Sequence, residues 1–212
     1  QSLFERLLEV QGKDFWSLLE IQYRMNDKIM NFSNYQFYDG KLKSAASVAD
    51  HTINDLGIEV NEKKCFTDKA LIPEEVVAFL DTTNMEAKER SLPGSNSYDN
   101  PVEGELVLDI ADEAQRLGLK AKDIAIITPY KDQVDLLNHR CNNENIEINT
   151  VDGFQGREKE VVILSFVRSN NKDNIGFLRD LRRLNVSLTR AKRKLIVVGD
   201  SNTISANKTY AD

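Results

Sequence analysis

Five short runs of apolar, largely β-branched residues constrain the fold of this chain more than any other feature. The runs are Val76–Leu80, Ile124–Thr128, Ile146–Val151, Val161–Val167 and Leu195–Val198. Most of the later runs are almost wholly apolar, which is typical of strands buried on both faces of a parallel sheet. Helical patterns lie between the runs. The sequence therefore predicts βαβ units with right-handed crossovers, and hence an α/β fold with a doubly wound, mainly parallel sheet.

The segments between these runs have the periodicity of amphipathic helices. The predicted helices are Pro101–Leu117, which a glycine follows as at a helix C-terminus, Lys131–Asn142 and Phe177–Lys192. The polar segment Glu86–Asn100 is rich in turn formers and predicts a mobile surface loop. Asp39–Pro73 has weak periodicity and predicts an irregular excursion.

Charge is spread unevenly along the 212 residues. The net charge is −6, yet the stretch from Arg157 to Lys194 has eleven Lys or Arg against four Asp or Glu, a local charge of +7 that leaves −13 for the rest. A polyanion is therefore expected to meet the C-terminal third. The sequence has no apolar run of about 18 residues and no secretory signal, so an intracellular location, cytoplasmic or nuclear, is expected.

Signatures for binding metal or phosphate are missing from the sequence. The two cysteines and two histidines lack metal-ligand spacing, so no metal site is expected. The sequence has neither a G-x-x-x-x-G-K-[ST] phosphate loop nor a G-x-G-x-x-G after a strand, and no predicted strand ends in the Asp-Glu pair that holds magnesium in P-loop enzymes. If this domain handles ATP, it cannot do so alone.

The predicted helix Phe177–Lys192 has a basic face. Arg179, Arg183 and Arg190 fall within roughly 40° of one another at helical spacing, opposite the apolar side. Such a face is either simply solvated or a phosphate-binding surface. Asp180 is the only acidic residue between Phe177 and Lys192, and most of the basic residues are arginine. Both facts favour the second interpretation, because arginine suits planar recognition of phosphate.

Two further motifs are ambiguous when each is taken alone. The segment Thr150–Glu160, TVDGFQGREKE, places two glycines after a strand, which fits either a close approach to phosphate or an ordinary turn. The segment Leu19–Met25, LEIQYRM, sets an aromatic residue beside an arginine. Such a pair fits either a functional site or an ordinary core residue beside a residue at the rim of the core.

In order and spacing, these motifs resemble motifs IV, V and VI of superfamily 1 helicases. The matching segments are QYRM, TVDGFQGREKEVVILSFVRSN and RRLNVSLTRAKRKLIVVGD, with IITPYKDQ and SYDNPVE in support. The resemblance spans about Leu19 to Asp200 and points to the group of the nonsense-mediated-decay helicase and senataxin-like proteins. It implies the second, C-terminal RecA-like lobe of such an enzyme, with the phosphate loop and magnesium ligands on a first lobe.

The resemblance implies an ATP site built from these motifs. Tyr23 would stack on the adenine. Arg24 and Arg190 would act as catalytic arginine fingers that neutralise charge on the γ-phosphate. Glu158 would hydrogen-bond the ribose, and Gly156 would shape the loop beside it.

The resemblance also implies a grip on single-stranded nucleic acid. Thr128 and Thr150 end two strands that look adjacent, where side chains and backbone N–H groups would hold successive phosphates. Pro129, Tyr130 and Asp152 would contact sugar or base. Contacts to phosphate carry no sequence code, so little sequence preference is expected, and DNA is not distinguished from RNA.

The predicted organisation is an N-terminal helix over residues 1–18, a RecA-like helicase domain over 19–204 and a tail over 205–212. The leading hypothesis is the C-terminal lobe of an ATP-dependent helicase that uses ATP with Mg²⁺, with its first lobe and single-stranded DNA or RNA as partners, and inactive alone. Two alternatives are a degenerate module that binds nucleic acid or protein without ATP, and a free-standing nucleotide-binding protein. Because a module without hydrolysis has no reason to keep Tyr23, Arg24, Glu158 and Arg190 together, the set favours the first hypothesis.

Overall fold

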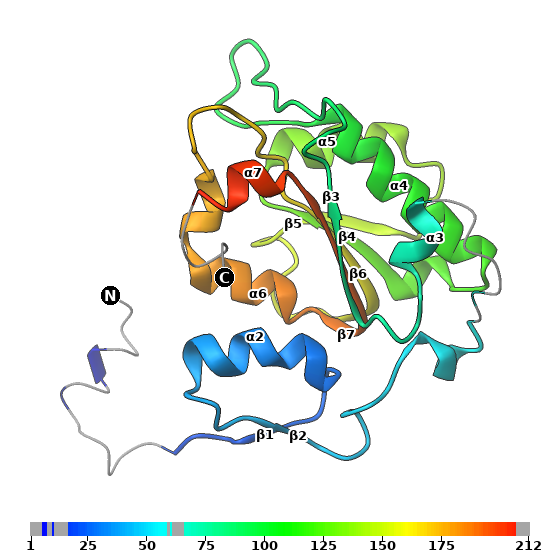
Figure 1. Cartoon of the computed structure of the whole chain (residues 1–212), viewed down its shortest axis with the longest axis vertical. Coiled ribbons are helices and arrows are strands. Elements are labelled where there is room, and N and C mark those ends of the chain that lie inside the picture. Colours follow the sequence, from blue (N-terminus) through cyan, green and yellow to red (C-terminus); the bar gives the residue numbers. More distant parts are fainter. Residues whose placement is uncertain (1–5, 8–9, 11–16, 59, 61–65, 207–212) are drawn as a thin grey trace.

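A five-stranded sheet lies at the centre of the molecule, with strand order β3-β7-β6-β4-β5 and every neighbouring pair parallel (Figure 1). The computed structural model describes residues 6–7, 10, 17–58, 60 and 66–206. The strands are β3 (Val77–Asp81), β4 (Ile124–Thr128), β5 (Glu147–Thr150), β6 (Lys159–Ser165) and β7 (Ala191–Gly199). All five predicted strands are confirmed, and β4 has the predicted bounds.

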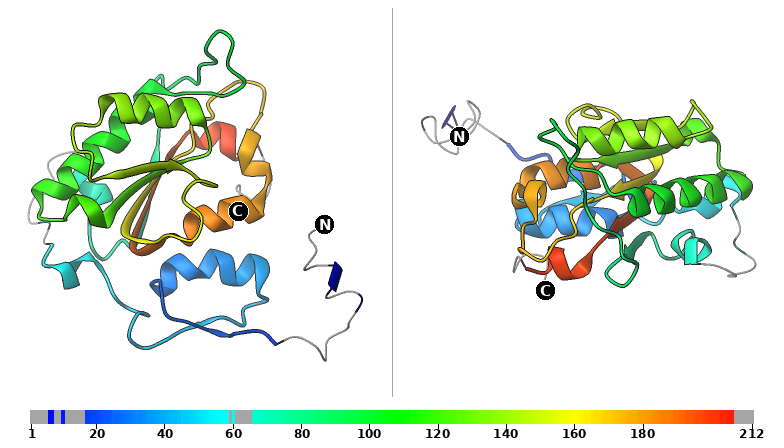
Figure 2. Two further views of the ribbon diagram at one scale, coloured as in Figure 1. Left: turned by 180° about the vertical axis from the view of Figure 1, so that it is seen from behind. Right: turned by 90° about the horizontal axis from the view of Figure 1, so that it is seen from above.

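Helices cover both faces of this sheet (Figure 1, Figure 2). One face packs against α3 (Phe66–Ala70), α4 (Pro101–Arg116) and α5 (Lys131–Arg140), and the other against α2 (Asp27–Phe37), α6 (Leu181–Leu188) and α7 (Ser201–Ile204). Ile126 and Ile163 enter the core under α4, whereas Ile127 and Leu164 enter the core on the α2 and α6 side. Burial on both faces explains the almost wholly apolar runs. The predicted α/β, doubly wound, RecA-like architecture is confirmed.

α4 begins and packs as its sequence predicts. Asn100 caps the helix by accepting a hydrogen bond from the Glu103 N–H at 3.2 Å, and Pro101 occupies the first turn, where its missing N–H costs nothing. Gly104 faces α5, and a Cβ there would lie 2.6 Å from Leu136 Cδ2. Glycine therefore lets the two helices approach closely.

The long basic helix predicted over Phe177–Lys192 is wrong in extent. Gly176–Arg179 forms the 3₁₀ turn η4, and α6 starts only after Asp180, whose side chain accepts hydrogen bonds from the first backbone N–H groups of the helix. α6 ends at Leu188, and β7 begins three residues later. Arg179, Arg183 and Arg190 thus belong to three different segments, so they do not form one helical face.

The N-terminal part is irregular, as predicted for Asp39–Pro73. The short parallel strands β1 (Ile21–Gln22) and β2 (Lys43–Ser44) pair with each other, and the 3₁₀ turn η2 (Ile53–Leu56) follows β2. A further 3₁₀ turn, η3 (Ala121–Asp123), lies far along the chain, directly before β4. The predicted helix over residues 1–18 and the predicted tail over 205–212 fall largely outside the described residues. No helix in the described ranges is long and apolar enough to cross a membrane.

The segment Glu86–Asn100 is a loop, as predicted, and it is anchored near its C-terminal end. Its regular pairing is a single antiparallel bridge between Arg90 and Asp99, which a bidentate ion pair reinforces at 2.7 and 2.8 Å. Asp99 and Asn100 are buried where the loop joins α4. The loop is therefore fixed to the body of the domain at the start of α4.

Candidate functional site

Charged side chains gather at the edge of the sheet where β6 and β7 begin. Glu158 directly precedes β6, Arg190 directly precedes β7, and Lys192 is the second residue of β7. The Lys159 N–H donates a hydrogen bond to the Arg190 carbonyl at 3.0 Å, which ties the two strand starts together. Arg24 reaches this edge from the bend between β1 and α2. The structure thus brings together three of the five residues predicted for the ATP site, namely Arg24, Glu158 and Arg190.

Glu158 is the carboxylate at the centre of this cluster. Arg24 Nε donates to one of its oxygens at 2.5 Å, and Lys192 Nζ lies 3.1 Å from the other. Burial alone would raise the pKa of Glu158, but the hydrogen bonds and positive charges of Arg24 and Lys192 outweigh it, and the pKa is lowered. Glu158 is therefore an anion at neutral pH, and Lys192 is a member of the cluster that sequence analysis missed.

Arg190 is held by oxygen atoms of the same domain. Its Nε donates to the Val186 carbonyl at 2.8 Å, Nη1 to the Arg157 carbonyl at 3.3 Å and Nη2 to Thr189 Oγ1 at 3.1 Å. Burial and the positive charge of Arg24 lower the pKa of Arg190, although arginine stays protonated at neutral pH. Glu158 pairs directly with Arg24 and Lys192, and its charge also acts on Arg190, so the cluster has an excess of positive charge that suits a polyphosphate.

Tyr23 stands beside the cluster with 72% of its surface exposed, so its ring is available for stacking on a planar ligand. Gln22, to which the sequence alone assigned no role, shapes the bend that carries Tyr23. Its Oε1 accepts hydrogen bonds from the backbone N–H groups of Arg24 at 2.8 Å and Met25 at 2.9 Å. Its Nε2 donates to the Met25 carbonyl at 2.6 Å and to Ser44. An amide can fill both roles at once, which a carboxylate cannot.

Thr128 and Thr150 lie at the opposite edge of the sheet, where β4 and β5 end. They are register partners in adjacent parallel strands, so the predicted adjacency is confirmed. Thr128 is only 1% exposed, and its hydroxyl has no hydrogen-bond partner among the described residues. Thr150 is half-buried, and its Oγ1 accepts a hydrogen bond from the Gly153 N–H at 3.1 Å. The Thr128 hydroxyl is enclosed in this conformation, whereas Thr150 borders the surface.

The other residues predicted at this edge lie on either side of the threonines. Pro129 is half-buried, and Asp152 is exposed. Both carboxylate oxygens of Asp152 accept hydrogen bonds from Arg183, whose guanidinium also lies 4.6 Å from the centre of the Phe177 ring. Arg183 therefore already has an anionic and an aromatic partner.

Tyr130 contacts Tyr98, Phe177 and Arg168, and these four residues form a small aromatic cluster. The Tyr130 hydroxyl accepts hydrogen bonds from the Phe177 N–H at 3.2 Å and from Arg168 Nη1 at 3.3 Å, and its ring meets Tyr98 edge to face with centroids 5.4 Å apart. The Arg168 guanidinium lies 4.3 Å from the centre of the Tyr98 ring and forms a bidentate pair with Glu89 at 2.8 and 3.1 Å. Arg168 thus orders the side chains at the carboxyl edge.

Arg168 is directed into this cluster by a strained turn. Val167 has φ 70°, a region that β-branched residues avoid, and the Arg168 N–H closes a γ-turn by donating to the Phe166 carbonyl at 2.8 Å. Glu103 accepts the Val167 N–H at 2.8 Å, and Asn100 Nδ2 donates to the Val167 carbonyl at 3.1 Å. The SYDNPVE segment therefore clamps the end of β6.

One loop connects the two edges. Residues Val151–Arg157 leave β5 at the carboxyl edge and lead to β6 at the amino edge. Phe154, in the middle of the loop, is fully buried in the core on the α2 and α6 side. Gly156 has φ 83° and no atom within 4 Å of the place of a Cβ, so the backbone conformation, and not a close neighbour, requires glycine.

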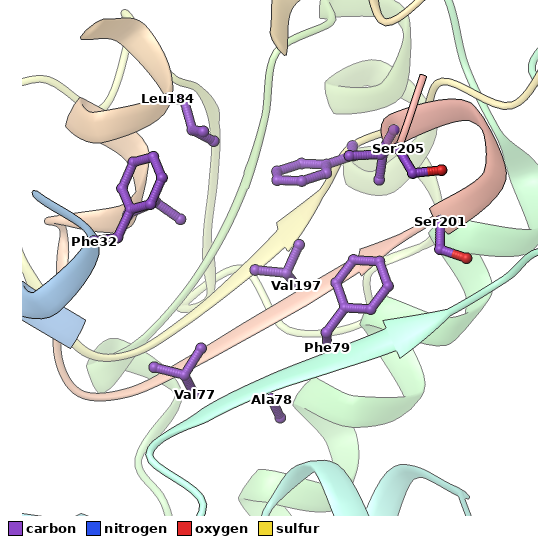
Figure 3. A pocket seen from close by; sticks show the side chains of 11 residues that line it. Phe32, Val77, Ala78, Phe79, Leu184, Val197, Ser201 and Ser205 are labelled. Atoms are coloured by element: carbon purple, nitrogen blue, oxygen red, sulfur yellow. The ribbon is translucent and has the colours of Figure 1, made fainter. Parts of the chain in front are cut away.

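An apolar hollow of about 320 Å³ lies between β3 and the helices α2, α6 and α7 (Figure 3). Its lining includes Phe32, Val77, Phe79 and Leu184, with Ser201 at its rim. None of the described residues that line it carries a charge.

A parallel α/β domain with an arginine-rich edge and the three motifs is a superfamily 1 helicase-like domain, and comparison with known proteins agrees. The chain belongs to the AAA domain family AAA_12, which matches residues 1–202.

Relatives match nearly the whole chain. It is 45% identical over 212 residues to "Uncharacterized ATP-dependent helicase MJ0104" of Methanocaldococcus jannaschii, a match that covers 99% of this chain and 30% of that protein. It is 41% identical to "DNA-binding protein SMUBP-2" of Rattus norvegicus, over 100% of this chain and 21% of that protein. It is 38% identical to "DNA replication ATP-dependent helicase/nuclease DNA2" of Homo sapiens, over 94% of this chain and 20% of that protein. The chain thus spans less than a third of the length of these relatives.

Proposed function

We propose that this chain is the C-terminal RecA-like lobe of an ATP-dependent DNA or RNA helicase, similar to the nonsense-mediated-decay helicase and senataxin-like group. Residues 19–204 form the lobe, residues 1–18 lead in from a first lobe and 205–212 are a tail. The convergence of Arg24, Glu158 and Arg190 beside an exposed Tyr23 carries the proposal. The printed names of the relatives, which include ATP-dependent helicases, support it.

The chemistry of the amino edge fits a nucleotide. The Tyr23 ring would stack on adenine, and Glu158 would accept hydrogen bonds from the ribose hydroxyls. Arg24 and Arg190 would bind the γ-phosphate and neutralise the charge that develops as the phosphoryl group leaves. Gly156 lets the loop beside Glu158 adopt its positive φ.

The magnesium ion that accompanies ATP would be held elsewhere. Among the residues that the structure describes, no group of three or more His, Cys, Asp or Glu side chains could hold a metal ion. The sequence has no phosphate loop either. A first lobe would supply both, and the two lobes would close on ATP and open after hydrolysis.

The carboxyl edge would bind the single strand. Thr150, the N–H groups that follow it and the hydroxyl of Thr128 would hold phosphates, and Pro129, Tyr130 and Asp152 would contact sugar or base. The enclosed hydroxyl of Thr128, which has no partner among the described residues, would gain one if the strand end opened on binding.

Replacing Arg190 by alanine in the complete protein tests the proposed function. We expect kcat of the ATPase stimulated by single strands to fall roughly 10³-fold or more, because an arginine finger acts on transition-state charge. ATP affinity should fall less than turnover, and Tm should change little. Arg116→Ala, which removes an exposed arginine at the end of α4, is the control. Near-normal turnover in Arg190→Ala would contradict the proposal.

A further inference from the structure

Thr189 touches both arginines of the proposed ATP site. Its Oγ1 accepts a hydrogen bond from Arg190 Nη2 at 3.1 Å, and its carbonyl oxygen accepts one from Arg24 Nη1 at 3.3 Å. Within the described residues, Thr189 is the one residue that hydrogen-bonds both guanidinium groups. Arg24 comes from the start of the chain and Arg190 from its last third. Thr189 is therefore a shared hydrogen-bond partner that links two arginines far apart in the sequence.

The hydroxyl of Thr189 is itself fixed. Thr189 caps the C-terminus of α6 and is 9% exposed. Its Oγ1 donates to the Asn185 carbonyl at 2.8 Å, with the Val186 carbonyl a longer second acceptor at 3.3 Å, and its N–H donates to the Asn185 carbonyl at 3.0 Å. A hydroxyl has one hydrogen, and the bond from Oγ1 uses it, so an oxygen lone pair is directed at Arg190. The last turn of α6 therefore supplies a rigid acceptor.

We propose that Thr189 is a positioning residue that holds the Arg190 guanidinium at a set distance from Arg24, ready to converge on the γ-phosphate. The inference rests on the proposed function. Two like charges side by side repel, and one carboxylate, Glu158, lies beside them. Without the Thr189 hydroxyl, Arg190 keeps only two backbone acceptors and can swing away from Arg24. Catalysis gains when such groups are oriented before the transition state forms.

Thr189→Val and Thr189→Ser in the complete protein test this inference. Valine keeps the shape but removes the acceptor, so kcat should fall on the order of tenfold or more, as for loss of a hydrogen bond to a charged group. KM for ATP should stay within about twofold, and serine should restore turnover. Thr82→Val is the matched control, because Thr82 is also buried and its hydroxyl has no partner among the described residues. Should the valine variant fold poorly, Thr189→Ala removes the same acceptor.

A double-mutant cycle with Arg190→Ala separates positioning from a structural role. If Thr189 acts through Arg190, then Thr189→Val should change kcat less than about twofold when Arg190 is already alanine. An equal loss in both backgrounds, or a loss of Tm with parallel changes in kcat and KM, would overturn the inference. If Arg190→Ala lowers turnover but Thr189→Val does not, this inference alone fails. If Arg190→Ala itself is neutral, the proposed function fails first.

Discussion

At Gly176, backbone conformation and surroundings both require the absence of a side chain. The residue has φ 55°, and a Cβ would overlap the Tyr130 hydroxyl and the Arg168 guanidinium. These two groups hydrogen-bond each other and order the carboxyl edge of the sheet. The glycine that begins η4 thus determines how Tyr130 is presented.

Gly176→Ala should lower the free energy of unfolding by about 2 to 4 kcal/mol, because it adds overpacking to the cost of positive φ. Gly94→Ala is the matched control. Gly94 has φ 80° and open space around it, so alanine there meets only the backbone cost, roughly 1 to 2 kcal/mol. Urea denaturation of both variants measures the difference. Equal losses would show that Tyr130 and Arg168 do not confine Gly176.

Residues of this kind escape prediction from sequence. Val167 adopts positive φ although valine is among the residues least suited to it, so only its clamping by Asn100 and Glu103 accounts for the turn. Gln22 and Thr189 look like ordinary polar residues until Arg24 and Arg190 are placed beside them. By contrast, the adjacency of Thr128 and Thr150 could be predicted, because each ends a strand that its sequence predicts.

At the scale of elements, a buried carboxyl joins α4 to the end of β6. Glu103 is fully buried and accepts hydrogen bonds from Ser165 Oγ and the Val167 N–H, each at 2.8 Å. Burial raises the pKa of Glu103 to about 8, the hydrogen bonds oppose the rise, and the negative charge of Asp200 adds to it. Glu103 is therefore largely protonated in the folded protein at neutral pH.

This raised pKa makes stability depend on pH. Between the unfolded value of 4.5 and about 8, the folded state holds a proton that the unfolded state has lost. The contribution of Glu103 is therefore complete below pH 4.5 and is lost as pH rises through about 8. Relative to Glu103→Gln, which does not titrate, the unsubstituted protein should lose Tm steadily from pH 5 to 8. Parallel Tm curves for the two proteins would contradict the assignment. Burial lowers the pKa of Lys194 to about 8, so Lys194 changes the pH dependence of stability only above about pH 8.

Elements were predictable where burial dictates composition and unpredictable where polar residues break a pattern. Strands covered on both faces need apolar residues throughout, so their positions could be read directly. The helix predicted over Phe177–Lys192 failed because Asp180 caps a new helix and Lys192 and Arg193 belong to a strand. Arg193 is accommodated there by ion pairs with Glu160 at 2.8 Å and Asp55 at 2.5 Å. Long-range pairing of this kind leaves no local signal.

At the scale of the whole molecule, the positive stretch Arg157–Lys194 is less available to a polyanion than its charge of +7 suggests. Several of its basic residues pair with carboxylates from outside the stretch, namely Glu89, Asp55, Glu147 and Asp152. The sequence shows the excess of charge but not these pairings. The sequence also does not show that Arg24, Glu158 and Arg190 lie at the amino edge of the sheet, opposite Thr128 and Thr150.

We therefore expect this chain alone to bind single-stranded nucleic acid weakly and with a shallow dependence on salt. Each phosphate contact contributes about −0.7 to the slope of log K against log salt concentration for a single strand. Because several cations of the stretch Arg157–Lys194 are already paired with carboxylates, the slope should be only a few units. Fluorescence anisotropy with a labelled oligonucleotide at several salt concentrations measures it. Affinity indifferent to salt, or a strong preference for one base sequence, would point to another mode of recognition.

The loop Val151–Arg157 gives the domain a mechanical character of its own. The strand before it, β5, rises only about 13 Å over its four residues, so the two edges are one short strand apart. Phe154, buried in the core between the ends of the loop, anchors the middle of the loop. Asp152 and Glu158 therefore lie on either side of one anchored point of the same short segment. Any movement of the loop that a ligand at one edge induces would have to pass this anchor to reach the other edge.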